Sequence, residues 1–72
     1  MELKEGNKIK ITGINCGRVC SSRYSCMGIL ENTIMEIISI QPLKGPIVVK
    51  VGESEYSIGR GMFSKLEYEI IE

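Results

Sequence analysis

The chain has 72 residues, its nine Lys plus Arg balance nine Asp plus Glu, and it contains neither His nor Trp. A single domain of this length, which we take to span residues 1–72, buries only a small core and leaves little room for an enclosed catalytic cleft. A neutral chain also lacks the long-range field that draws proteins to phosphate backbones or anionic lipid, so nucleic-acid binding is disfavoured.

The sequence predicts a cytosolic protein. No apolar run approaches the roughly 20 residues of a transmembrane helix, so we expect no direct membrane insertion. Residues 1–6 lack the apolar core of a signal peptide. Three cysteines are an odd number, which argues against the disulfide framework of a secreted domain.

The first predicted element is a strand over residues 8–14. Here Ile9 and Ile11 alternate with lysines, which is the pattern of a strand with one solvated face. A break at residues 15–17, which contains Gly17, then ends the strand.

Residues 19–28 are the one helical candidate before residue 60. Gly28 is a natural C-terminal stop, and the serines weaken the helix, so we expect about two turns. Ile29 and Leu30 then pack back toward the core. The side chains that could share the buried face of the helix are Val19, Cys20, Tyr24 and Met27.

A second strand is predicted over residues 33–41, after a turn in which Asn32 takes the left-handed backbone region. Both faces of this strand carry apolar side chains. It is therefore either covered on both sides, or it exposes one face to a partner or to a second subunit. One face holds Met35, Ile37 and Ser39, and the other holds Ile34, Ile38 and Ile40.

The second strand and a third, residues 47–51, flank a short Pro/Gly segment and predict a β-hairpin. Pro42 and Pro46 cannot donate ladder hydrogen bonds, so each marks a strand end. Gly45 is expected to take the positive φ of a tight reversal. Leu43 then lies at a stiff apolar tip, and stiff contacts cost less entropy on binding.

The C-terminal part predicts two more strands, residues 56–58 and 66–70. A polar turn at residues 52–55 precedes the fourth strand, and residues 62–64 make a single helical turn before the last one. The side chains expected to face inward from the last strand are Leu66, Tyr68 and Ile70.

About five short strands with one small helix indicate a mainly β protein, a small closed or nearly closed barrel. An SH3-like barrel and an OB-fold both have five strands. An OB-fold usually places its helix between strands three and four. Here the helical candidate lies between strands one and two, which favours the SH3-like barrel.

The cysteines have the spacing C-x₃-C-x₅-C. Thiolates bind zinc and other soft metals, but a closed zinc site needs a fourth ligand and the chain has no His. We interpret Cys20 and Cys26 as small apolar fillers. The alternative is a transition-metal or redox site on Cys16, Cys20 and Cys26, and no other cofactor is predicted.

Catalysis is not expected. Without His, the chain cannot build a Ser–His–Asp or Cys–His set. The segment around Arg60 lacks the phosphate-loop pattern, so it marks a strand end. We interpret Arg60 as a solvated side chain, and the alternatives are a pair with a carboxylate or a contact with a partner. Glutamates that alternate with apolar residues mark the solvated faces of strands: Glu53, Glu55, Glu67 and Glu69.

Apolar side chains in the turns are the candidates for partner binding. They either cap the core or form the floor of a peptide or protein groove, and methionines suit adaptable interfaces. The candidate partner-binding residues are Met27, Leu30, Pro42, Leu43, Pro46, Met62 and Phe63.

The order of these signals resembles that of FeoA proteins over nearly the whole chain. The segments that carry the resemblance are residues 3–6, 9–14, 23–29, 42–47 and 58–60, together with Gly52. The family pattern usually has Leu where this chain has Tyr24, and Gly in the turn near Asn32, so the packing of the helix is where the chain departs from it.

The resemblance implies a small cytosolic SH3-like domain linked to bacterial ferrous iron uptake, of a type also found at the C-terminus of DtxR-type repressors. It implies a non-enzymatic accessory or regulator that docks on the GTP-binding cytosolic domain of the membrane transporter FeoB. Two alternatives remain: a metal-binding or metal-sensing domain that uses the cysteines, and a small barrel associated with RNA.

Overall fold

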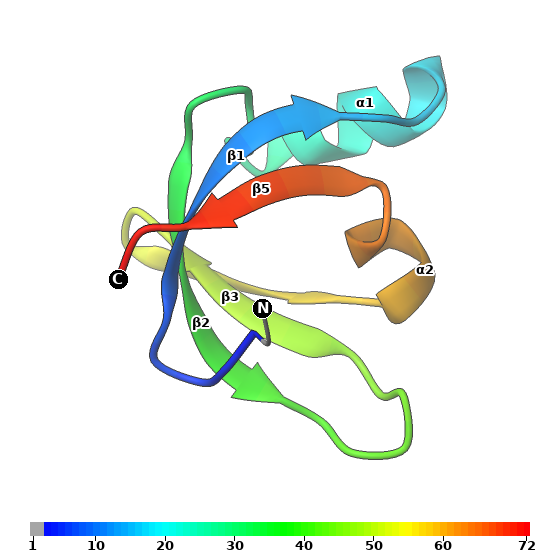
Figure 1. Ribbon diagram of the computed structural model, residues 1–72. Coiled ribbons are helices and arrows are strands. Elements are labelled where there is room, and N and C mark those ends of the chain that lie inside the picture. The colour runs from blue at the N-terminus through cyan, green and yellow to red at the C-terminus, as the bar shows by residue number, and fades with distance from the viewer. Residues whose placement is uncertain (1–2) are drawn as a thin grey trace.

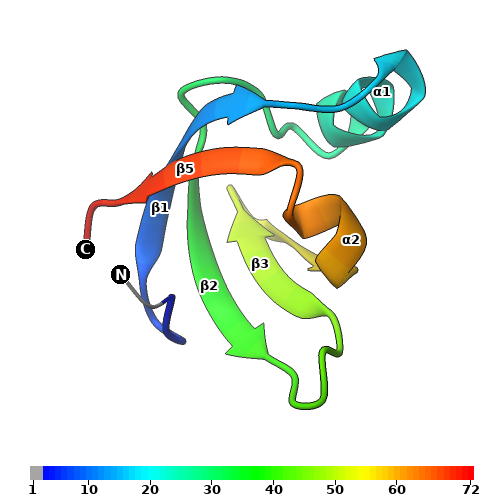
Figure 2. The same ribbon diagram turned by 45° about the vertical axis from the view of Figure 1, so that its right-hand side comes forward.

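The computed structural model describes residues 3–72, and its five strands form one antiparallel sheet. The strand order is β4-β3-β2-β1-β5. The sheet curls so that β5 faces β3 across the interior, and both helices lie at the same end of this roll (Figures 1 and 2). The elements are β1 (Lys8–Ile14), α1 (Arg18–Cys26), β2 (Ile34–Ile40), β3 (Ile47–Val51), β4 (Ser54–Ile58), α2 (Arg60–Phe63) and β5 (Leu66–Ile70).

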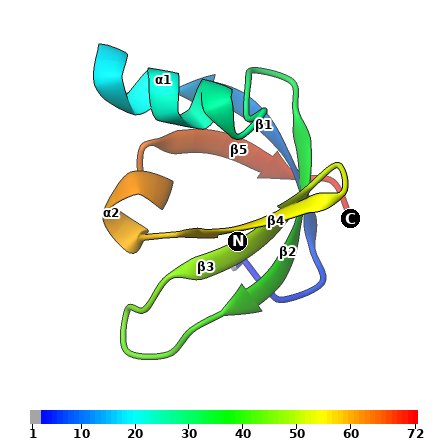
Figure 3. The same ribbon diagram turned by 180° about the vertical axis from the view of Figure 1, so that it is seen from behind.

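The mainly β, SH3-like fold predicted from the sequence is confirmed. A helix lies between the first two strands, as expected, and a helical turn precedes the last strand. The fourth strand is longer than predicted, because residues 54 and 55 pair with β3 and only Gly52 and Glu53 form the turn. The view from behind shows α2 leading from β4 to β5, the two edge strands of the sheet (Figure 3).

Two irregularities in strand pairing allow the sheet to curl. The register shifts between Ile11 and Gly13 where β1 pairs with β5, and between Ile37 and Ser39 where β2 pairs with β3. Such bulges bend a strand and increase its right-handed twist. A five-stranded sheet thereby wraps around its own core.

Because of the irregularity in β2, the side chains that share a face of this strand differ from those predicted. The alternation changes phase at Ile38, so Ile40 packs against the core on the same side as the buried Ile37. Ile34, by contrast, is 52% exposed. The strand therefore has one core face, and its outer face carries two isolated isoleucines, Ile34 and half-buried Ile38. Pairing of subunits through this face stays a prediction.

The core is made mainly of β-branched and aromatic side chains, and all five strands and both helices contribute to it. Full burial of one such side chain contributes about 1.5–3 kcal/mol. Inward packing of β5 is confirmed, since its residues Leu66, Tyr68 and Ile70 belong to the core or pack against it. The buried residues are Ile9, Ile11, Tyr24, Ile29, Met35, Ile37, Ile47, Val49, Ile58, Phe63 and Leu66.

Helix α1 ends in a Schellman motif. Gly28 has φ +79°, its N–H donates to the Ser25 carbonyl at 3.0 Å, and the Ile29 N–H donates to the Tyr24 carbonyl at 2.9 Å. Tyr24 and Ile29 are both fully buried, which adds the apolar contact of this motif. The predicted glycine stop is confirmed, and so is the left-handed turn at Asn32, φ +75°.

Two apolar residues near α1 lie outside the core, against expectation. Val19 is 75% exposed and Leu30 is 53% exposed. Val19 lies in the first turn of α1, on the side away from Tyr24. Leu30 follows the Schellman motif, which turns the chain so that Ile29 alone enters the core.

Tyr24 joins the two helices. Its side chain is buried, and its hydroxyl donates a hydrogen bond to the Met62 carbonyl of α2. A leucine at this position would have no such donor. The tyrosine thus fixes α1 against α2 while its ring fills a place in the core.

We expect Tyr24→Phe to lower the free energy of unfolding by about 1 kcal/mol, the usual net contribution of one hydrogen bond. The ring stays in the core, so the slope of the free energy of unfolding against urea concentration should not change. Urea unfolding followed by circular dichroism measures both quantities. An unfolding midpoint equal to that of the wild type would contradict the role given to the hydroxyl.

Burial of the Tyr24 hydroxyl predicts that the stability of the protein depends on pH. Burial raises the pKa of Tyr24 above its ordinary value of 10.0, because the low-dielectric core disfavours the charged phenolate. A raised folded-state pKa gives stability that is complete below the unfolded pKa and is lost as pH rises through the folded pKa. The stability difference between the wild type and Tyr24→Phe should therefore shrink in alkaline solution, and a constant difference between about pH 8 and pH 11 would contradict this.

Candidate functional site

The β2–β3 hairpin tip, residues 41–46, presents the most exposed large apolar side chain in the described part of the chain. Leu43 is 98% exposed. Leu43 and Lys44 have φ values of +57° and +59°. These left-handed conformations cost roughly 1–2 kcal/mol per residue for side chains of this kind.

The positive φ predicted at Gly45 is wrong. Gly45 is needed for space instead: a Cβ there would lie 2.8 Å from Cβ of Gln41 and 3.1 Å from the Pro42 carbonyl oxygen. The reversal falls on the two residues before the glycine. The tip places a leucine and a lysine where glycine or asparagine would be expected.

Arg60 of α2 holds the base of the tip. Its Nε donates to the Gly45 carbonyl at 2.7 Å, and its Nη2 donates to the Gln41 carbonyl at 3.0 Å. Within the tip, the Gly45 N–H donates to the Pro42 carbonyl at 3.0 Å. The prediction of a solvated Arg60 is therefore wrong, because the guanidinium is half-buried and fixes both sides of the loop.

A cavity of about 380 Å³ opens beside the tip. Phe63 contributes an apolar wall, and its ring packs against Tyr68 with centroids 5.6 Å apart. Lys44 and Arg60 lie at the same cavity. The residues that line it are Leu3, Lys44, Ile47, Arg60, Phe63, Ser64 and Tyr68.

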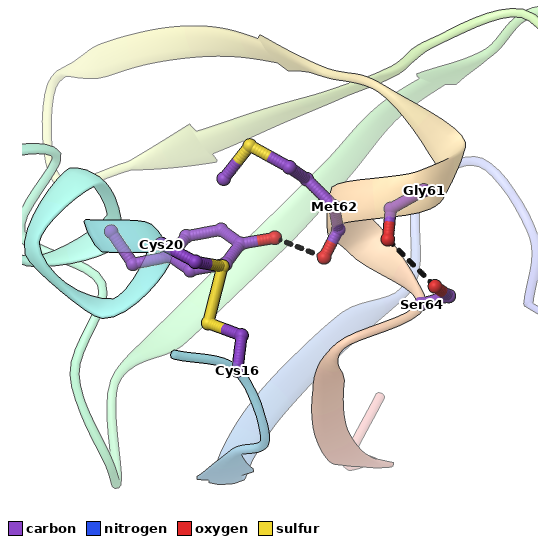
Figure 4. The surroundings of a disulfide bond; sticks show 6 residues. Cys16, Cys20, Gly61, Met62 and Ser64 are labelled. Atoms are coloured by element: carbon purple, nitrogen blue, oxygen red, sulfur yellow. Dashed lines mark hydrogen bonds between the residues drawn. A yellow bond between two sulfur atoms is a disulfide. The ribbon is translucent and has the colours of Figure 1, made fainter. Parts of the chain in front are cut away.

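A second cavity, of about 430 Å³, lies between the first turn of α1 and α2. It is lined by Gly17, Arg18, Val19, Cys20, Arg23 and Met62. Cys16 and Cys20 form a disulfide beside Met62 (Figure 4). Cys20 packs against the core, as expected of an apolar filler, but it does so in a disulfide and not as a free thiol.

The third cysteine, Cys26, is exposed and free. The spacing of the cysteines did not reveal the disulfide, because pairing depends on how the β1–α1 connection approaches the helix. Within residues 3–72 no three cysteine or carboxylate side chains gather in a way that could hold a metal. A metal site on all three cysteines stays a prediction for the reduced chain.

The structure divides the predicted partner-binding residues into three groups. Pro42, Leu43 and Pro46 are exposed together at the hairpin tip, and Phe63 lines the cavity beside it. Met62 lines the cavity at the disulfide. Met27 and Leu30 lie between α1 and β2, at the other end of β2 from the tip. The sequence did not single out Lys44, Arg60 and Tyr68 as parts of the tip surface.

No helix in the described residues is long and apolar enough to cross a membrane. The fold and surface define a small SH3-like module whose distinctive features are a fixed apolar hairpin tip and two surface cavities. The FeoA domain family matches residues 1–70. The chain belongs to the FeoA family, which is involved in ferrous iron transport.

Solved structures support the same fold. An iron uptake regulatory protein (FeoA) superposes with a TM-score of 0.88 at 23% identity, over 97% of this chain and 92% of that one. Iron(II) transport protein A from Clostridium thermocellum superposes with a TM-score of 0.89 at 23% identity, over 96% of this chain and 43% of that one. A FeoA-like protein from Clostridium acetobutylicum superposes with a TM-score of 0.84 at 21% identity, over 97% of this chain and 81% of that one. No curated protein matches the chain.

Replacing Arg60 with lysine should loosen the tip. A lysine keeps the charge but cannot reach two carbonyls with a planar fork, so we expect a loss of about 1 kcal/mol. Amide hydrogen exchange should be faster for Gly45 and Gln41, whose N–H groups close the loop, and unchanged in β1. Unchanged exchange at both tip amides would contradict the clamp.

Proposed function

We propose that this protein is a non-enzymatic accessory of ferrous iron uptake that binds the GTP-binding cytosolic domain of the FeoB transporter. Membership of the FeoA family supports the link to iron transport. An accessory role agrees with the composition of the interior, since the buried residues among 3–72 are apolar except for the Tyr24 hydroxyl.

The observation that carries docking is the geometry of Leu43. Its backbone adopts a conformation that costs free energy, and its side chain is 98% exposed, so it gains nothing from the core. Strain of this kind is typical of functional positions. Burial of the leucine against a partner would recover about 1.5–3 kcal/mol.

The clamp on the tip makes such burial efficient. Two prolines and the two Arg60 hydrogen bonds hold the loop in one conformation before binding. Little conformational entropy is then lost on association. The adjacent cavity at Phe63 supplies a concave apolar surface next to the projecting leucine.

The test compares two variants that remove the same backbone strain. Leu43→Asn and Lys44→Asn each place a residue that tolerates positive φ, so each should raise stability by roughly 0.5–1 kcal/mol. Only Leu43→Asn removes the apolar group. We expect it to weaken binding to the purified GTP-binding domain about tenfold or more, and Lys44→Asn to change it less than about threefold.

Isothermal titration calorimetry gives the affinities, and urea unfolding confirms that both variants fold. Absence of wild-type binding at high micromolar concentrations would overturn the proposed partner. Wild-type affinity in Leu43→Asn would overturn the docking surface while leaving the partner in place.

A further inference from the structure

The disulfide between Cys16 and Cys20 has no part in the docking proposal, yet it is a redox-active group beside a surface cavity. Cys16 lies in the short connection between β1 and α1, and Cys20 lies in the first turn of α1. Both are half-buried, and Cys20 faces the cavity that Met62 lines. We propose that Cys16–Cys20 is a reversible redox site for cellular thiols, and that its state decides the conformation of the first turn of α1.

The position of the disulfide suits a local role better than a global one. It links residues separated by four positions, so it removes little chain entropy from the unfolded state compared with a long loop. The rest of α1 has its own attachments. Tyr24 is buried and bonded to Met62, and the Schellman motif fixes the helix end. The fold therefore does not depend on the cross-link.

The first turn of α1, in contrast, has few other attachments. Its N-cap is Gly17, which offers no side-chain cap, and the turn contains no acidic residue to oppose the helix dipole. The Ser21 N–H donates to the Gly17 carbonyl at 2.9 Å, which is the hydrogen bond that closes this turn. Reduction would leave that hydrogen bond without covalent support. The turn also carries Arg18, Val19 and Cys20, which form one wall of the cavity.

The surroundings of Cys20 favour thiol exchange. Cys20 borders the cavity of about 430 Å³, and Arg18 and Arg23 line the same cavity. Cations and a helix N-terminus favour the thiolate, which is the leaving form in exchange. A thiolate R–S⁻ then attacks the sulfur of Cys16.

Reduction of the disulfide takes two successive thiol–disulfide exchanges. The first attack forms a mixed disulfide R–S–S–Cys16, breaks the Cys16–Cys20 bond, and leaves the electron pair on the sulfur of Cys20. A second R–S⁻ attacks the R sulfur of the mixed disulfide, forms R–S–S–R, and releases Cys16 as a thiolate. Two thiols are oxidised, the protein gains two electrons, and two protons from water complete its thiols.

The test uses the full chain with Cys26→Ser, which removes the free thiol and prevents scrambling. The oxidised protein is equilibrated with mixtures of reduced and oxidised glutathione, then alkylated and weighed by mass spectrometry. We expect each molecule to carry either no alkylated cysteine or two. The ratio of reduced to oxidised protein should follow the ratio of reduced to oxidised glutathione, and the oxidised protein should form again when oxidised glutathione is added. A disulfide that persists under native conditions in excess reduced glutathione would overturn the proposal.

Hydrogen exchange locates the effect. On reduction, the Ser21 amide should exchange about tenfold or more faster, while the Met27 and Ile29 amides at the other end of α1 keep their protection. The variant Cys16→Ser/Cys20→Ser should reproduce this pattern without any reductant. Unfolding of the whole domain on reduction, or unchanged exchange at Ser21, would contradict a local switch.

The arginines provide a kinetic check. Arg18→Gln/Arg23→Gln should slow reduction by about two- to fivefold, because the leaving thiolate of Cys20 loses its cationic surroundings. The matched control is Lys50→Gln, which removes an exposed cation on β3 and should leave the rate unchanged. Equal rates in all three proteins would contradict the assigned chemistry. None of these outcomes depends on binding to the transporter.

Discussion

The hydrogen bond from the Tyr24 hydroxyl to the Met62 carbonyl is the contact on which the functional surface depends. It holds α1 against α2 at the end of the roll where both helices lie. Helix α2 has four residues and could not form alone in water, where isolated helices shorter than about 12 residues are marginal. Tertiary contacts of its side chains and backbone therefore keep this single helical turn in place.

Each side chain of α2 serves a different neighbour. Arg60 bonds the hairpin tip, Met62 lines the cavity at the disulfide, and Phe63 enters the core and packs on Tyr68. Because α2 joins the two edge strands of the sheet, its position also sets how far the roll opens. A short helical connection thus supports two surface features that lie far apart in the sequence.

The strands, the small helix and its glycine stop were predictable because local rules decide them. Alternating β-branched residues specify strands, and the left-handed positions of Gly28 and Asn32 follow from the low cost of positive φ in those residues. The phase change at Ile38 was not predictable, because pairing with β3 decides it. The positive φ of Leu43 was not predictable either, because leucine has no intrinsic preference for the left-handed region.

The sequence predicted the apolar tip with Leu43 and its flanking prolines, but it did not reveal the contacts that hold this candidate site. Its central hydrogen bonds end on backbone carbonyls, those of Gln41, Gly45 and Met62, which every residue carries and no motif marks. A pattern search finds clusters of side chains, whereas this protein positions single side chains against the main chain. In such a protein a backbone held in a costly conformation, as at Leu43, is the feature that points to the candidate site.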